Sequence, residues 1–277
     1  MIDISKIDYS VLDRPEVLHF LFHPRPEPPL SPAQAADSTG LIPHEKDILI
    51  PVEEEVVIGA RFHMAEKSGA NLLFFHGNGE IVADYDELGP VYNQMGVNFL
   101  AVDYRGYGRS TGKPTVSAMM RDCHIIFEFV QNWLRQNNFH GPILLMGRSL
   151  GSASVLELAA AWGDSTDGLI VESGFAYATP LLQLLGIDLE ALGFKEEKGF
   201  RNIDKIRNFN KPTLIIHAEF DHIIPFSEGE ALYNASSSPD KTFLKIPGAN
   251  HNDIFMRGLQ EYLAAVKNIV DRVKTNI

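Results

Sequence analysis

The chain has little cysteine and no long hydrophobic run. Cys123 is the single cysteine among 277 residues, so an internal disulfide framework is excluded and a reducing compartment fits the composition. Cys123 lies in an apolar helical run, which favours a buried small side chain over a reactive thiol. No apolar run approaches the roughly 18 residues of a transmembrane segment. Met1–Ser10 lacks the basic start and apolar core of a signal peptide. We therefore expect a soluble, cytoplasmic protein.

Basic residues are also scarce. Lysine and arginine total 24 against 36 acidic residues, and the formal net charge of -12 excludes nucleic acid as a partner, because phosphate binding needs a basic face. No spacing of His, Cys, Asp and Glu is typical of zinc, so we expect no metal. The glycine-rich stretch 106–112 has one residue too many for a dinucleotide-binding motif and is interpreted as a turn. We expect no cofactor, and the oligomeric state stays open.

The pattern of apolar residues predicts an α/β fold. Asp47–Val52 and Val56–Met64 alternate apolar and polar residues, as antiparallel strands with one wet face do. Six continuous apolar runs follow as buried strands: Asn71–Phe75, Phe99–Asp103, Ile143–Met146, Leu169–Glu172, Thr213–His217 and Phe243–Ile246. Helix-length segments lie between or after them: Ile81–Met95, Val116–Asn137, Ser152–Trp162, Glu228–Ala235 and Ile254–Lys274, the last with Leu259, Leu263, Val266 and Val270 on one side. This alternation predicts a mostly parallel, eight-stranded sheet with roughly six helices on its two faces.

Two segments stand outside this alternation. Residues 1–46 form a predicted proline-rich arm, extended by its prolines and packed on the domain of residues 47–277 through Leu18, Phe20, Leu21 and Phe22. We favour this packing role over docking of the proline cluster to an SH3-type partner. The leucine-rich segment 176–205 follows a strand end, where open α/β sheets bind ligands. We interpret it as a short lid over an apolar pocket; the alternative is a helix that only packs on the core.

The stretch from Gly147 to Gly151 has the order of a nucleophile elbow. An apolar strand ends in Gly-Arg-Ser-Leu-Gly, and a helix of small residues follows at once. The turn strains the backbone at Ser149, so the residues two before and two after it must be small. The helix N-terminus beyond Ser149 favours developing negative charge. Ser149 is therefore the candidate nucleophile.

A serine nucleophile needs a histidine base, and the histidine needs an acid. On an α/β sheet the chain order is serine, acid, histidine, each at a strand carboxyl end. His251 follows the last predicted strand, and Asp221 follows the strand before it, so both fit. Glu172, at the end of a preceding strand, is the rival acid. His222 lies beside the acid and follows the wrong strand for the base.

The oxyanion of the reaction needs two backbone N–H donors. Leu150, directly after the nucleophile, is one candidate. Asn78 is the other, because it lies in the glycine-containing loop His76–Gly79 after a buried strand, where the backbone can approach a ligand closely. Arg148 has two open interpretations: it steers an acidic substrate, or it pairs with a neighbouring carboxylate.

Five motifs together resemble the α/β-hydrolase superfamily. They are His76-Gly77-Asn78-Gly79, Val102–Ser110, Gly147-Arg148-Ser149-Leu150-Gly151, Asp221 with Ile223-Ile224-Pro225, and Gly248–Asp253. The resemblance covers roughly residues 47–275, and the serine hydrolases that include the α/β-hydrolase-domain proteins and depalmitoylases are the most similar branch. It implies an α/β-hydrolase fold with Ser149, Asp221 and His251 as the triad and with Asn78 and Leu150 as oxyanion donors.

The sequence thus predicts a serine hydrolase that cleaves a carboxylic ester or thioester through an acyl-enzyme, without a cofactor. The predicted partner is a small-molecule or acyl substrate. One alternative is a peptidase or amidase with the same triad, because residue types do not separate these bonds. The other is a binding protein that keeps the fold without catalysis.

Overall fold

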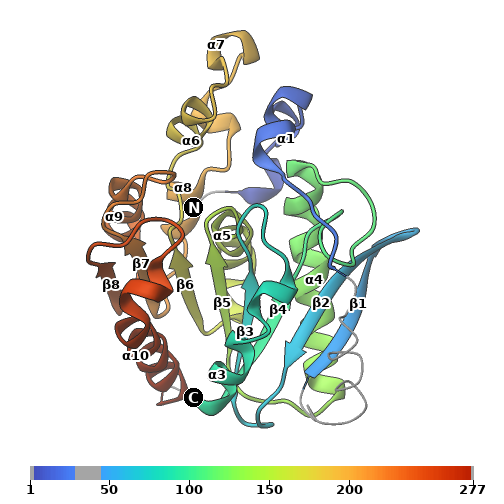
Figure 1. Cartoon of the computed structure of the whole chain (residues 1–277), viewed down its shortest axis with the longest axis vertical. Helices are drawn as coiled ribbons and strands as arrows, with labels where there is room; N and C mark the ends of the chain where they lie inside the picture. The colour runs from blue at the N-terminus through green and yellow to red at the C-terminus, as the bar shows by residue number, and fades with distance from the viewer. Residues whose placement is uncertain (1–2, 29–44, 276–277) are drawn as a thin grey trace.

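An eight-stranded sheet runs through the centre of the molecule (Figure 1). The structure is a computed structural model that describes residues 3–28 and 45–275. The sheet order is β1-β2-β4-β3-β5-β6-β7-β8. The strands are β1 (Glu45–Glu53), β2 (Val56–His63), β3 (Ala70–Phe75), β4 (Val97–Val102), β5 (Ile143–Arg148), β6 (Gly168–Glu172), β7 (Thr213–Ala218) and β8 (Lys241–Ile246). β1–β2 and β2–β4 are antiparallel pairs, and the remaining neighbours are parallel. The predicted α/β-hydrolase fold with a mostly parallel, eight-stranded sheet is confirmed.

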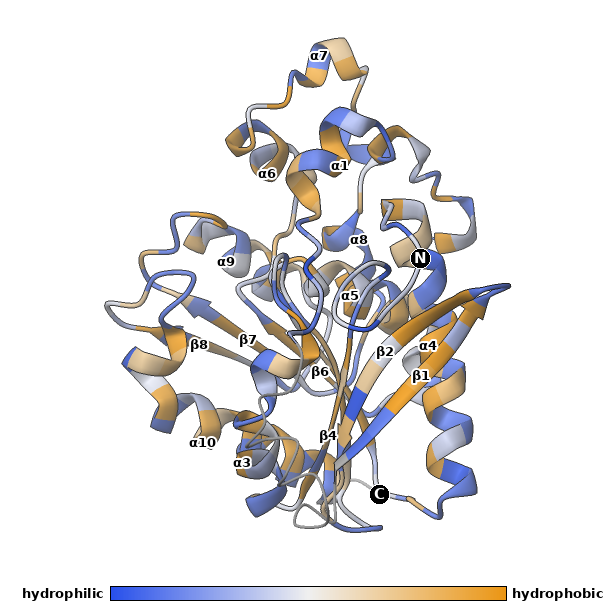
Figure 2. Cartoon of the chain, turned by 45° about the vertical axis from the view of Figure 1, so that its right-hand side comes forward, coloured by the Kyte–Doolittle hydropathy of each residue, from blue (hydrophilic) through white to orange (hydrophobic). Residues whose placement is uncertain are grey.

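Helices cover both faces of the sheet. The main ones are α3 (Leu88–Gln94), α4 (Val116–Gln136), α5 (Gly151–Trp162), α9 (Phe226–Ala235) and α10 (Ile254–Thr275). Successive β3 side chains enter opposite cores, Leu73 and Phe75 with α4 and α5, and Leu72 and Phe74 with α3 and α10. Apolar colour accordingly marks much of the strands and alternates with polar colour along the helices (Figure 2). Burial of each such aliphatic or aromatic side chain stabilises the folded state by about 1.5–3 kcal/mol relative to its exposure to water.

Two predicted helices differ from the observed ones. The segment 81–95 is not one helix but a short 3₁₀ helix, Val82–Tyr85, followed by α3. Pro90 explains the break, because proline fits the first turn of a helix and disrupts its interior. In α10 the backbone at Gly258 is non-helical, with φ of -144°. Beyond this kink Leu259 is 43% exposed, whereas Val266 and Val270 are buried as predicted and Leu263 is partly buried.

The N-terminal arm contains a helix that the prediction of an extended arm missed. α1 (Pro15–Leu21) begins with Pro15 at its first position, where a missing N–H costs nothing. Leu21 and Phe22 are buried as expected, but Phe20 is 40% exposed, so its predicted packing role is wrong. Pro29 and Pro32 of the proline cluster lie outside the described residues.

The predicted lid is a chain of short helices after β6. It comprises α6 (Ala178–Leu184), α7 (Leu189–Leu192), a 3₁₀ turn (Glu196–Lys198) and α8 (Asn202–Ile206). Gly186 and Gly193, both with positive φ, separate the pieces. In Figure 1, α6 and α7 lie with α1 at one end of the molecule, above the central strands. α8 packs on α5, with Ile206 fully buried. The lid function stays a prediction.

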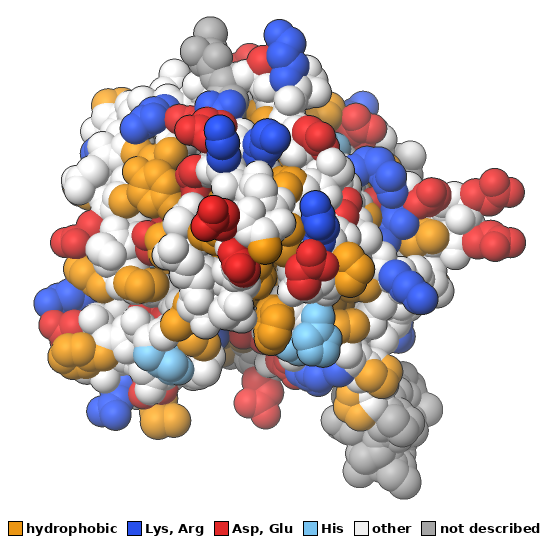
Figure 3. Space-filling view, turned by 90° about the horizontal axis from the view of Figure 1, so that it is seen from above, with side chains coloured by type: hydrophobic (Ala, Val, Ile, Leu, Met, Phe, Trp, Pro, Cys, Tyr) orange, Lys and Arg blue, Asp and Glu red, His pale blue; other side chains and the backbone are white. Residues whose placement is uncertain are grey.

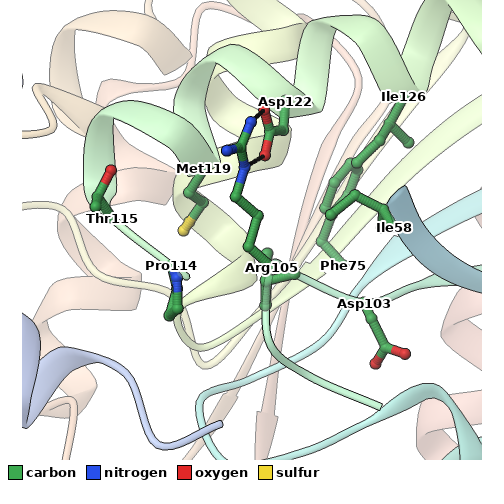
Figure 4. A pocket seen from close by; sticks show the side chains of 10 residues that line it. Ile58, Phe75, Asp103, Arg105, Pro114, Thr115, Met119, Asp122 and Ile126 are labelled. Atoms are coloured by element: carbon green, nitrogen blue, oxygen red, sulfur yellow. Dashed lines mark hydrogen bonds and ion pairs between the residues drawn. The ribbon is translucent and has the colours of Figure 1, made fainter. Parts of the chain in front are cut away.

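A small cavity lies between the sheet and α4 (Figure 4). Its volume is about 10 Å³, which is room for about one water molecule and not for a substrate. Its wall includes the ion pair from Arg105 Nε to Asp122 Oδ2, 2.6 Å long. We therefore interpret this cavity as a packing void rather than a binding site.

Candidate active site

The backbone at Ser149 has the strained geometry of a nucleophile elbow. Ser149 lies between β5 and α5 with φ of 51°, a left-handed conformation that is uncommon for serine. A Cβ on Gly147 would lie 2.4 Å from the carbonyl oxygen of Gly151, and one on Gly151 would lie 2.1 Å from that of Phe75. Only glycine fits at either position. The Ser149 N–H donates to the Glu172 carbonyl at 2.9 Å, which fixes the turn against β6.

Asp221 and His251 come together from loops that are 30 residues apart. His251 Nδ1 lies 2.7 Å from Asp221 Oδ2, and both residues are buried. Asp221 Oδ1 also accepts from the N–H groups of Ile223 and Ile224. Burial opposes ionisation, but the bonds from His251 and from these N–H groups hold the pKa of Asp221 below its ordinary value of 3.8. A carboxylate that stays ionised can orient the imidazole and stabilise its positive charge.

The rival acid Glu172 is engaged elsewhere. Its Oε2 accepts from the Tyr262 hydroxyl at 2.7 Å, and its Oε1 lies 3.6 Å from Arg148 Nε. Burial raises the pKa of Glu172. Within residues 3–28 and 45–275, Glu172 makes no hydrogen bond to His251. The structure also places His217 near the acid, but its Nε2 bonds to the Ile224 carbonyl and burial lowers its pKa.

The loop after β3 lies directly beside the elbow. A Cβ on Gly151 would also come within 2.9 Å of the His76 carbonyl oxygen, so the start of α5 touches this loop. Among the described residues, the N–H groups of Asn78 and Leu150 donate to no other protein group. Two free backbone donors on adjacent segments are what an oxyanion hole requires. No hydrogen bond joins Ser149 Oγ to His251 in the described part of the chain.

Arg148 connects the nucleophile elbow with the His76–Gly79 loop and the His251 loop. Its guanidinium is buried; Nε lies 3.0 Å from Glu80 Oε1, and Nη2 donates to the His251 carbonyl at 3.1 Å. Glu80 Oε2 in turn accepts from the Gly77 N–H at 2.6 Å. Of the two open interpretations of Arg148, pairing with neighbouring carboxylates is therefore the observed one. Sequence reasoning missed Glu80, and its acidic side chain directly after the His76–Gly79 loop was the available signal.

Among the described residues, the surface around this end of the molecule carries no extended patch of one charge. Seen from above, acidic and basic side chains are interspersed with hydrophobic ones and with histidines (Figure 3). Among the described residues there is no group of three or more His, Cys, Asp and Glu side chains that could hold a metal ion. No helix in the described ranges is both long and apolar enough to cross a membrane.

Comparisons with known proteins identify relatives of this chain. The family model described as "Serine aminopeptidase, S33" matches residues 66–190. Human α/β-hydrolase domain-containing protein 17B is 31% identical over 220 residues, which cover 74% of this chain and 68% of that protein. The lysophosphatidylserine lipase ABHD12 of Xenopus tropicalis is 32% identical over 60% of this chain and 46% of its own length. The Pyrococcus furiosus esterase Pf2001 superposes with a TM-score of 0.70 at 18% identity, covering 91% of this chain and 98% of that one.

The chain belongs to the α/β-hydrolase family, in the branch of the α/β-hydrolase domain-containing proteins. It is a hydrolase. The match at 18% identity supports the fold, and the closer relatives carry the family assignment.

Proposed function

We propose that the protein hydrolyses carboxylic esters or thioesters through an acyl-enzyme on Ser149, with His251 as the base and Asp221 as the acid. The observation that carries this proposal is the 2.7 Å contact between His251 Nδ1 and Asp221 Oδ2, beside a serine held at positive φ. This contact assigns the proton to Nδ1 and leaves Nε2 with a lone pair to accept the serine proton. Lipase and esterase names among the relatives and structural neighbours support ester chemistry.

In the first half-reaction His251 Nε2 takes the proton of Ser149 as Oγ bonds to the carbonyl carbon of the substrate. The carbonyl π electrons move to the oxygen, and the N–H groups of Asn78 and Leu150 stabilise that negative charge. The tetrahedral intermediate then collapses, the bond to the alkoxide or thiolate breaks, and the leaving group takes the proton from His251. A water molecule repeats these steps on the acyl-enzyme and releases the carboxylic acid and free Ser149.

Probe labelling and ester hydrolysis test this function. A fluorophosphonate probe should label the wild type and not Ser149→Ala, and hydrolysis of short-chain p-nitrophenyl esters should fall in parallel by about 10⁴-fold or more. Ser154→Ala is a matched control, because Ser154 lies in the same helix α5 and its hydroxyl has no hydrogen-bond partner among the described residues. Labelling that persists in Ser149→Ala, or folded wild type with neither activity, would refute the mechanism.

The second candidate is a peptidase or amidase with the same residues. The description of the matching family as a serine aminopeptidase favours this alternative. Paired substrates that share one acyl group and differ only in a p-nitrophenyl ester or p-nitroanilide bond separate the two functions. We expect the ester to have the higher kcat/KM; a higher value for the anilide would make the amidase the principal activity.

A further inference from the structure

The N-terminal arm crosses the edge of the candidate site just after α1. The backbone N–H of Gly108 donates to the Arg25 carbonyl at 2.9 Å, and the N–H of Glu27 donates to the Gly108 carbonyl at 3.1 Å. Pro26 pairs with Gly108 as a parallel β-bridge. In Figure 1, α1 lies at the same end of the molecule as α6 and α7, and the segment after it runs from there toward the sheet. The arm is therefore fastened beside the loops that follow the central strands.

One residue of this arm, His23, holds the side chain of Asn78 at both ends. The Oδ1 atom of Asn78 accepts from the His23 N–H at 2.8 Å and from the Tyr107 hydroxyl at 2.7 Å. The Nδ2 atom of Asn78 lies 2.8 Å from His23 Nδ1. Because an amide nitrogen only donates, Nδ1 of His23 is the acceptor in this bond. The Asn78 side chain is thus fixed by the arm and by a buried tyrosine.

The next residue of the loop is held as well. Arg25 Nε donates to the Gly79 carbonyl at 2.8 Å, and the Arg25 guanidinium pairs with Asp84. Gly79 has φ of 76°, in a region where glycine moves freely among several conformations. External contacts are needed to keep such a loop in one geometry. The arm supplies them on both sides of the peptide between Asn78 and Gly79.

We propose that His23 and Arg25 are positioning residues of the oxyanion hole. They hold the loop so that the Asn78 N–H stays aimed at the substrate oxygen, although neither residue needs to touch the substrate. This inference rests on the proposed function. Removal of a whole oxyanion donor costs about 10²–10³-fold in kcat. If the donor stays in place and only its support is removed, kcat should fall by less, on the order of tenfold.

The test compares His23→Ala with His19→Ala, an exposed histidine in α1 of the same arm. The side chain of His23 is also exposed, so neither change should lower Tm by more than about 2 °C. For a p-nitrophenyl ester we expect His23→Ala to lower kcat about tenfold with KM nearly unchanged, and His19→Ala to change neither. A trifluoromethyl ketone forms an adduct with the serine whose oxygen occupies the oxyanion hole. In His23→Ala its Kd should rise by about the same factor by which kcat falls.

A double-mutant cycle tests the route of the effect. In an Asn78→Ala background, the added change His23→Ala should lower kcat by less than about twofold. The amide that His23 holds is already absent from that background. His23→Gln, whose amide oxygen can accept the same bond, should retain more activity than His23→Ala. Additive losses in the cycle, or a raised KM with unchanged kcat, would overturn the positioning role.

Hydrogen exchange gives a readout that does not depend on turnover. Backbone amides of residues 77–80 should exchange about tenfold faster in His23→Ala than in the wild type and in His19→Ala. Unchanged exchange in His23→Ala, together with unchanged kcat, would refute the inference. If the wild type hydrolyses no ester, the proposed function fails, and the exchange rates still decide whether the arm holds the loop.

Discussion

Two histidine–aspartate pairs lie at the carboxyl ends of neighbouring strands, and their surroundings differ. His251 and Asp221 follow β8 and β7, and their contact is 2.7 Å long. His76 and Asp103 follow β3 and β4, with Nε2 of His76 3.1 Å from Oδ1 of Asp103. The first pair is 5–8% exposed, and the second is fully enclosed. The same two residue types are thus placed once beside a strained serine and once in the interior.

The ring nitrogens explain what each pair can do. In His76 both ring nitrogens lie within hydrogen-bonding distance of protein oxygen atoms, Asp103 Oδ1 on one side and the Gly77 carbonyl on the other, so neither faces a site for a substrate. In His251, Nδ1 is engaged and Nε2 has no partner among the described residues. Asp103 Oδ1 additionally accepts from the Val82 N–H at 3.0 Å, which ties two loops together. A histidine–aspartate pair therefore indicates a base only where one ring nitrogen stays free.

The largest expected effect comes from removal of the candidate base. His251→Ala should lower kcat by about 10⁴–10⁶-fold, because Ser149 then has no proton acceptor. The free energy of unfolding should change much less, since the ring makes a single hydrogen bond within the described residues, to Asp221. Steady-state ester kinetics with thermal unfolding of the same samples measure both quantities. Activity retained within about tenfold would eliminate His251 as the base.

The second prediction compares the two candidate acids. Asp221→Asn should lower kcat about 10⁴-fold, because the amide does not hold the imidazole in the productive tautomer. Glu172→Gln keeps the size of the side chain and leaves the Asp221–His251 contact intact, so its kcat should fall less than about tenfold. The reverse order of losses would exchange the two roles.

The third prediction concerns the enclosed pair. His76→Leu removes one of two donors to Asp103 and should lower the free energy of unfolding by about 1–3 kcal/mol. Because His76 adjoins the oxyanion loop, kcat should also fall, but by less than the roughly 10²–10³-fold expected for a lost oxyanion donor. Urea unfolding and ester kinetics check both. If His76→Leu lowered kcat as much as His251→Ala does, the proposed difference between the two histidine–aspartate pairs would be wrong.

Local sequence pattern was sufficient for the sheet and for the placement of the site motifs. Continuous apolar runs such as Asn71–Phe75 predict buried parallel strands, and the observed bounds differ by a few residues. Chain order alone did not separate the two acids, because Glu172 and Asp221 both lie between Ser149 and His251; the loop after the strand Thr213–His217 favoured Asp221. In the structure Asp221 contacts His251. The catalytic roles of these residues stay predictions until they are measured.

Contacts between distant segments were not predictable in the same way. His23 and Asn78 are 55 residues apart, and no periodicity connects an arm residue to a loop after β3. The pairing of Arg148 with Glu80 likewise depends on how two strand ends meet. The helix Pro15–Leu21 was missed because the prolines that follow it dominated the interpretation, although Pro15 itself is a common first residue of a helix.

The smallest expected effect is a pH dependence of stability at the Asp221–His251 pair. The pKa of Asp221 is below 3.8 in the folded protein, so folding favours its ionised form. The resulting stabilisation is complete above the unfolded pKa and is lost as pH falls from about 3.8 through the folded pKa. Wild-type stability should therefore fall more steeply between pH 5 and pH 3 than that of Asp221→Asn, which cannot ionise. Urea unfolding at several pH values measures both slopes, and parallel slopes would show that the His251 and backbone contacts do not favour the carboxylate.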